Sequence, residues 1–273
     1  AAAVLGLQPN QICKIAGDAE GRMLPDALED AIRNGGATAS IVVANAGSTI
    51  HGVMDPLSEI AAITKKCGAW LHVDAIYGGA VMFSERHRHL LDGIEQADSV
   101  VLGPQKWMYV PRLSAVLLLR DKGRFDERLK MALPYSITGD EHRGQWGLQG
   151  SRRADAVTLW ILLQVLGTDA IGQMIDQSID LTRDFHDLLK AHPDVEPTHK
   201  PDLNVQCFRV PSLAGQDEEI LRVDRDLMAM AGPWASVSRW NDELIFRTVL
   251  LPPRTDIPIL EALIDNVSTS LTV

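Results

Sequence analysis

The chain has 273 residues, of which 46% are hydrophobic and 23% are charged, a composition that excludes disorder and collagen and is typical of a globular protein. Its 36 acidic and 26 basic residues give a net charge of −10, which repels phosphate backbones and argues against nucleic-acid binding. The longest apolar runs, such as 115–119 and 159–163, are far shorter than the roughly 20 residues that cross a bilayer. We therefore predict neither a nucleic-acid partner nor a membrane segment.

Cysteine usage and the first residues bear on the cellular compartment. Cys13, Cys67 and Cys207 stand far apart with no C-x-x-C pair, so neither a disulfide framework nor a zinc knuckle is indicated, and a reducing, cytoplasmic setting is predicted. The chain opens with three alanines rather than Met, without the basic segment and apolar core of a secretory signal. We expect no signal peptide, and the missing Met favours processing or truncation of a longer polypeptide.

Strands and helices are predicted to alternate through the first 120 residues. Asp55 and Pro56 are expected to start one helix as its N-cap and first turn, and Gly68 to end it. This alternation predicts an α/β fold with a mostly parallel sheet. The expected strands are 12–16, 41–46, 69–75, 99–102 and 115–119, and the other expected helices are 25–33 and 88–95.

The pattern changes after Gly150. Two long helical patterns are separated at Gly167, and an α+β unit is predicted beyond them. We place a domain boundary at this glycine, which gives domains of residues 1–167 and 168–273. The expected helices are 152–166, 169–190, 218–231 and 257–271, and the expected strands are 205–210, 236–239 and 244–249.

Polar residues follow three of the predicted strands, at 45–49, 72–79 and 103–107. Because functional groups collect at the carboxyl ends of parallel strands, Asp74 and Lys106 are candidates for one site. Asp74 has an equally good interpretation as a turn carboxylate, and a single lysine is usually a solvated surface residue. Lys106 lies in an otherwise apolar stretch, however, where a desolvated amine is suited to attack a carbonyl group.

Three ordered strings carry a family resemblance: HVDAIYGGA at 72–80, ADSVVLGPQKWMYVP at 97–111 and GSRRADAVTLW at 150–160. They resemble the group II amino acid decarboxylases, which depend on pyridoxal 5'-phosphate (PLP). The resemblance extends over nearly the whole chain. It implies the PLP-dependent transferase-like fold (fold type I, the aspartate aminotransferase superfamily), with an incomplete large domain followed by a small α+β domain.

The resemblance also implies roles for single residues. Lys106 matches the lysine that binds PLP covalently, and Asp74 matches the aspartate that faces the pyridine nitrogen and keeps the ring protonated. Thr49 matches a residue near the phenolic oxygen of PLP. Asp55 matches an acid of the same turn, but a helix N-cap is at least as good an interpretation, so we leave it outside the predicted site.

Two further residues are expected to serve the reaction. Tyr135 matches the tyrosine of the mobile catalytic loop, which returns a proton to the substrate Cα after carbon dioxide leaves, and the alternative is an ordinary exposed loop tyrosine. Arg152 matches an arginine after this loop, with a structural or carboxylate-orienting role. His72 shares a strand face with Asp74, and we interpret it as a support for that carboxylate, with a plain core histidine as the alternative.

No metal is predicted. His87 and His89, at positions i and i+2, do not share a helical face, and no H-E-x-x-H or similar ligand spacing is present.

Three positions depart from the family pattern. Gln105 stands where a histidine is usual, and it can hydrogen-bond a phosphate but cannot carry a proton. Gly103 replaces a polar residue near the phosphate. Ile76 replaces a small alanine that packs on the PLP ring. Gln105 and Ile76 therefore belong to the predicted cofactor-binding set, together with Lys106, Asp74, Thr49 and His72.

The family also has an upstream phosphate-binding turn and a ring-stacking histidine that this chain lacks. We expect an N-terminal segment or a second chain to supply both, in a homodimer or a heterotetramer of split chains. The implied function is decarboxylation of an L-amino acid to the amine and carbon dioxide. Open alternatives are another fold type I reaction, such as transamination, aldehyde-forming oxidative deamination or aldol-type cleavage, and a non-catalytic pseudoenzyme subunit.

Overall fold

A mostly parallel sheet forms the first part of the molecule. The computed structural model describes residues 4–111, 114–121, 123, 153–230 and 232–272. The sheet has four strands, which lie in the order in which they occur in the sequence. The first three are parallel to one another, and the fourth is antiparallel to the third. The predicted α/β class is confirmed. The strands are β1 (Ile41–Asn45), β2 (Trp70–Ala75), β3 (Ser99–Leu102) and β4 (Val116–Leu119).

The two faces of this sheet differ in burial. Along β2, Leu71, Val73 and Ala75 are buried, whereas Trp70, His72 and Asp74 alternate with them and are half-buried, as the period-two geometry of a strand requires. Helix α2 (Leu57–Cys67) packs on the buried side and itself contacts α1 (Pro25–Asn34). The face that carries His72 and Asp74 is less covered, as the exposure of Ile41, Val43 and Leu117 shows.

An antiparallel sheet forms the second part, with the order β5-β6-β8-β7. In its core, Phe208 and Phe246, whose rings stack with centroids 5.3 Å apart, pack against the apolar faces of three helices. The strands and helices predicted for this part are confirmed as β6 (Val205–Arg209), α5 (Asp217–Ala229), β7 (Ser236–Trp240), β8 (Glu243–Val249) and α6 (Ile257–Leu271). The two-residue strand β5 (Glu196–Pro197) is an addition to the predicted elements.

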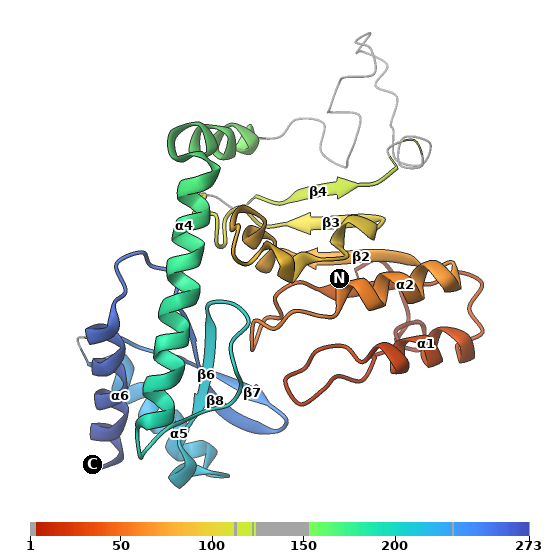
Figure 1. Cartoon of the computed structure of the whole chain (residues 1–273). Helices are drawn as coiled ribbons and strands as arrows, with labels where there is room; N and C mark the ends of the chain where they lie inside the picture. The colour runs from red at the N-terminus through yellow and green to blue at the C-terminus, as the bar shows by residue number, and fades with distance from the viewer. Residues whose placement is uncertain (1–3, 112–113, 122, 124–152, 231, 273) are drawn as a thin grey trace.

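Helix α4 (Asp155–Ala191) connects the two parts, as Figure 1 shows. It is broken at Gly167, whose φ of 75° and ψ of 165° are not helical, at the position where the sequence predicts a separation. Beyond the break, Ile171 and Ile179 are buried in the core of the parallel-sheet part, and Phe185 is buried in the second core. Since α4 contributes to both cores, the domain boundary at Gly167 stays a prediction.

Among the described residues, α4 is also the one helix that is long and apolar enough to cross a membrane, with a mean hydropathy of 1.3 over 18 residues. Length and composition are weak evidence, because core helices meet the same criterion. Only 17% of that window is buried, whereas Ile171, Ile175 and Ile179, beyond the break at Gly167, lie in a protein core.

Three local predictions are wrong. Residues 12–16 form no strand, because no strand in the described part of the chain pairs with them; Gly17 makes an isolated bridge to Met23. The segment 88–95 forms two short 3-10 helices, η3 (Arg88–Leu91) and η4 (Ile94–Gln96), because Gly93 turns the chain with a φ of 97°. Asp55 does not cap α2, whose N-cap is Pro56.

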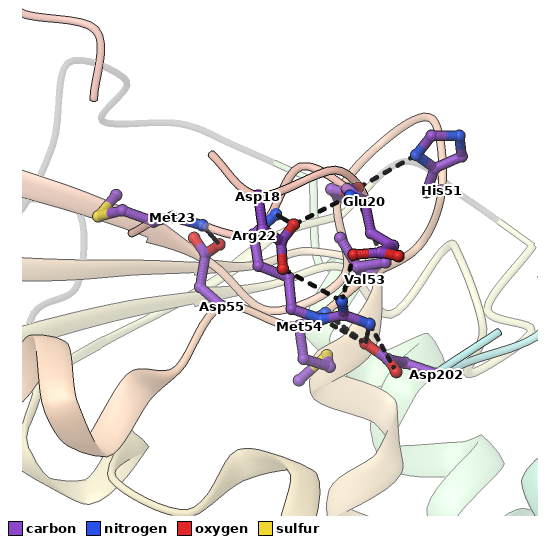
Figure 2. Close-up of polar contacts among 10 residues, drawn as sticks. Asp18, Glu20, Arg22, Met23, His51, Val53, Met54, Asp55 and Asp202 are labelled. Atoms are coloured by element: carbon purple, nitrogen blue, oxygen red, sulfur yellow. Dashed lines mark hydrogen bonds and ion pairs between the residues drawn. The ribbon is translucent and has the colours of Figure 1, made fainter. Parts of the chain in front are cut away.

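Asp55 instead joins three segments through its buried carboxylate. Its oxygens accept hydrogen bonds from the backbone N–H groups of Met23 at 2.8 Å and Asn45 at 2.7 Å, as Figure 2 shows for Met23. Burial raises the pKa of this carboxyl, and the two backbone donors act in the opposite direction. The role of Asp55 is therefore structural.

Arg22 links the N-terminal segment to the antiparallel-sheet part (Figure 2). Its Nη2 lies 3.1 and 3.0 Å from the two carboxylate oxygens of Asp202, and its Nη1 lies 3.4 Å from both Asp18 and Glu20. Asp202 also accepts a 3.1 Å hydrogen bond from the backbone N–H of Met54. Planar guanidinium–carboxylate pairs of this kind are strong and directional.

We expect Asp202→Asn to lower the free energy of unfolding by about 1–2 kcal/mol, since the charge pair is lost while the amide oxygen still accepts from Met54. Urea unfolding followed by circular dichroism measures the change. Asp180→Asn is the matched control, because the Arg86–Asp180 pair is about half exposed and such pairs contribute less than about 1 kcal/mol. Equal losses in the two variants would contradict a special role for the Arg22 pair.

Candidate active site

The candidate site lies at the carboxyl edge of the parallel strands. Asp74 is the fifth residue of β2, in register with Asn45 of β1 and Val101 of β3. Its Oδ1 accepts a 3.1 Å hydrogen bond from the backbone N–H of Ile76, which orients the carboxylate. Among the described residues, no hydrogen bond reaches Oδ2, so this oxygen is available to a ligand.

Lys106 follows the end of the adjacent strand β3 by four residues. The backbone N–H of Lys106 donates to the carbonyl of Gly103 at 2.9 Å, and that of Val110 donates to Pro104 at 3.1 Å, so residues 103–110 form a compact turn. The Lys106 side chain is exposed and has no ion pair with any described residue. The predicted juxtaposition of Asp74 and Lys106 on neighbouring strand ends thus agrees with the sheet order.

A buried aromatic residue anchors the lysine turn. Trp107 is fully buried and stacks on Tyr77, with ring centroids 5.5 Å apart. The Tyr77 hydroxyl donates to Oδ1 of Asn204 at 2.6 Å, and Asn204 in turn donates from Nδ2 to the carbonyl of Leu250. Burial raises the pKa of Tyr77 well above its usual range, which keeps its hydroxyl a donor. The antiparallel-sheet part therefore holds the lysine turn in place.

Sequence reasoning missed these supporting residues. Tyr77 and Trp107 lie inside the sequence strings that carry the family resemblance. Their positions close to Asp74 and Lys106 in the sequence could have indicated that they support the site. Asn204 gave no signal, because it reaches Tyr77 from 127 positions further along the chain.

Two departures from the family pattern, Gly103 and Ile76, lie against each other. A Cβ atom at position 103 would stand 2.5 Å from the carbonyl oxygen of Ile76 and 2.9 Å from its Cγ2. Side-chain carbons do not approach other atoms this closely, so this backbone requires glycine at 103. Both the backbone and the side chain of Ile76 therefore limit the space at position 103.

Gly103→Ala is expected to lower the free energy of unfolding by about 1–3 kcal/mol through overpacking. Adding Ile76→Ala should recover only part of the loss, because it removes the Cγ2 contact and leaves the backbone oxygen in place. A double-mutant cycle measured by urea unfolding checks this coupling. Strictly additive effects would show that the two positions are independent.

The remaining described site residues occupy the same edge and face. Thr49 is exposed in the turn after β1, in which Gly52 donates to the carbonyl of Ser48 at 2.9 Å. His72 lies two residues before Asp74, but its Nδ1 is 2.8 Å from the hydroxyl of Ser99. No hydrogen bond joins His72 to Asp74 within the described part of the chain, so a supporting role for His72 stays a prediction.

The donor set fits PLP. Asp74 has an available carboxylate oxygen, Lys106 has a free amine, and the side-chain oxygen of Gln105 is buried without a partner among the described residues. Rotation of the Gln105 amide exchanges its oxygen and NH₂ group, so it is equipped to donate to a phosphate. Tyr135 and Arg152 lie outside the described residues.

A separate hollow of about 320 Å³ is lined by residues of β3, of β4 and of the segment 79–97. Most of its lining is apolar and includes Met82, Leu91 and Leu118. None of the predicted site residues lines it. This hollow is therefore unrelated to the strand edge that carries Asp74 and Lys106.

Known proteins similar to this chain include several amino acid decarboxylases. Residues 1–211 match the pyridoxal-dependent decarboxylase conserved domain. The chain is 35% identical over 231 residues to cysteine sulfinic acid decarboxylase of the rat (Rattus norvegicus), covering 80% of this chain and 46% of that protein. It is 30% identical over 266 residues to aromatic-L-amino-acid decarboxylase of Bacillus atrophaeus, covering 92% of this chain and 55% of that protein.

Solved structures show the same fold. The crystal structure of mouse CSAD superposes with a TM-score of 0.90 at 28% identity, covering 98% of this chain and 60% of that one. The chain therefore belongs to the pyridoxal-dependent decarboxylase family and has the fold type I architecture. It spans about half the length of the curated relatives it matches.

Proposed function

We propose that this chain forms the lysine-bearing part of a PLP-dependent L-amino acid decarboxylase. The observation that supports this most strongly is the placement of Asp74 and Lys106 at the ends of adjacent parallel strands, in a member of the pyridoxal-dependent decarboxylase family. When bound, PLP supplies an electron-accepting ring that stabilises the charge left on the substrate Cα after carbon dioxide is lost.

The residues of this chain have distinct tasks in the proposed reaction. Lys106 would hold the cofactor covalently through Nζ, and the Asp74 carboxylate would keep its ring nitrogen protonated. Gln105 would donate to the phosphate, Thr49 would serve the phenolic oxygen, and Ile76 would pack on the ring. His72 acts indirectly, through the strand face that it shares with Asp74.

We further propose that another segment or chain completes the enzyme, in a homodimer or a heterotetramer of split chains. Ile41 is 73% exposed and Leu117 is 51% exposed on the sheet face that carries Asp74. Apolar side chains on a sheet face need a cover, and a covering segment would also shield the cofactor. A cytoplasmic location is proposed because all three cysteines are free thiols.

The test uses the full-length protein, or this chain together with any chain that co-purifies. After PLP is added, carbon dioxide release is measured over a panel that contains cysteine sulfinic acid and aromatic L-amino acids, the substrate types in the names of the relatives. We expect carbon dioxide and the matching amine in equal amounts. Keto acids or aldehydes without carbon dioxide would indicate another PLP reaction, and a protein that stays colourless with PLP would indicate a pseudoenzyme.

Tyr135→Phe should leave PLP binding intact and lower amine formation by roughly 10²-fold or more, because a phenyl ring is of similar size but has no transferable proton. Amine and aldehyde are quantified together by chromatography under oxygen, where aldehyde is expected to increase. Unchanged amine production would assign Tyr135 to its alternative, an ordinary exposed loop tyrosine.

A further inference from the structure

Two histidines and a cysteine, none of them among the predicted site residues, meet in a buried cluster. His51 follows β1, His199 lies between β5 and β6, and Cys207 is in β6. Their exposed fractions are 1%, 5% and 0%. One ring nitrogen of each histidine and the Cys207 Sγ all lie within 4.8 Å of one another.

The unused nitrogens of the two histidines point to a ligand. Nε2 of His51 and Nε2 of His199 are both buried and have no hydrogen-bond partner among the described residues. Buried polar atoms are almost always satisfied, so two orphans in one cluster require an explanation. The rings contact each other with centroids 4.4 Å apart.

Both Nδ1 atoms have a polar partner, and that of His51 is a carbonyl, which can only accept. His51 Nδ1 lies 3.1 Å from the backbone carbonyl of Glu20 (Figure 2), which places the proton on Nδ1 and leaves a lone pair on Nε2. His199 Nδ1 lies 3.2 Å from the hydroxyl of Thr198. A hydrogen bond from the second ring nitrogen fixes the tautomer and orientation of a metal-ligating histidine.

We propose that His51, His199 and Cys207 form a site for one thiophilic transition-metal ion, with Zn²⁺ as its first candidate. Imidazole and thiolate are the ligands that such ions prefer. Tetrahedral bond lengths of about 2.0–2.3 Å place ligand atoms roughly 3.3–3.7 Å apart, so the three side chains need to close by at most about 1.5 Å. Three protein ligands leave one position for a water molecule or another donor.

Binding converts the Cys207 thiol to a thiolate, which forms the metal–sulfur bond while the thiol proton passes to solvent. In the metal-free cluster the thiol donates to the carbonyl of Ile50 at 3.2 Å. Arg247, whose Nε donates to the same carbonyl at 3.1 Å, adds positive charge beside the site. The nearby carboxylates of Asp18, Glu20 and Asp202 are paired with the guanidinium of Arg22.

The position of the cluster indicates what the ion would do. His51 belongs to the turn that carries Thr49, whereas His199 and Cys207 belong to the antiparallel-sheet part. A bound ion would therefore join the two parts beside the proposed cofactor site. Sequence reasoning predicts no metal because positions 51, 199 and 207 show no short ligand spacing.

Co²⁺ titration of the full-length protein, kept reduced and recorded as difference spectra against the metal-free protein, tests the site. We expect one Co²⁺ per chain, a thiolate-to-cobalt charge-transfer band, and displacement of the cobalt by Zn²⁺. Cys207→Ser should abolish the band, and His51→Gln and His199→Gln should each raise Kd by at least about 10²-fold. Cys67→Ser and His89→Gln, which alter residues outside the cluster, should change neither.

Absence of the band in the wild-type protein would overturn the proposal without any variant, so the test does not depend on the folding of Cys207→Ser. A band that survives Cys207→Ser in a variant with cooperative thermal unfolding would also overturn it. The readout involves neither PLP nor amino acid substrate, so its outcome is separate from that of the proposed decarboxylation.

Discussion

Lys106→Ala should abolish turnover in the complete enzyme, with a loss of more than about 10³-fold. An amine that is held in the site reacts without a collision from solution, and this proximity raises the reaction rate strongly. The side chain is exposed, so its removal should leave the melting temperature nearly unchanged. Product formation and the visible absorbance after PLP addition measure the two consequences.

Covalent labelling makes the test of Lys106 specific. Borohydride reduction of the PLP-loaded protein, followed by peptide mass spectrometry, should place the cofactor on Lys106. Lys65→Ala is the control, because Lys65 is also exposed and lies on α2, outside the site. Labelling at another lysine, or full activity in Lys106→Ala, would remove Lys106 from its proposed role.

Asp74→Asn should lower kcat by about 10²–10³-fold, the usual effect of removing one preorganised electrostatic contact. The amide oxygen can still accept from the backbone N–H of Ile76, which now donates to Oδ1 at 3.1 Å, so folding and PLP binding should persist. What is lost is the negative charge that keeps the cofactor ring protonated. Steady-state kinetics and the visible spectrum of the same sample separate these effects.

Asp92→Asn is the matched control for Asp74→Asn, because it removes one exposed carboxylate outside the site. We expect this variant to keep wild-type kcat. A kcat for Asp74→Asn that equals that of the control would show that Asp74 is a turn carboxylate, the alternative that the sequence leaves open.

Much of the fold follows from local pattern. The alternating burial of β2 matches the predicted strand that contains His72 and Asp74, and Gly68 ends α2 with a φ of 66°. The predictions that are wrong share a cause. A strand at 12–16 needs a neighbouring strand to pair with. The predicted helix at 88–95 is interrupted at Gly93, which packs so closely on Ser58 that a Cβ atom would stand 2.5 Å from the Ser58 backbone nitrogen. Both conditions involve residues distant in the sequence.

The sequence by itself determined the strand-and-helix order, the family, and the placement of Asp74 and Lys106 at strand ends, because these depend on periodicity and contiguous motifs. Only the tertiary structure decided that Asp55 bridges Met23 and Asn45, that Asn204 supports Tyr77, and that Gly103 lies against Ile76. It also gathered the cluster of His51, His199 and Cys207. Such contacts depend on strand order and on the packing of one sheet against the other, which no local pattern encodes.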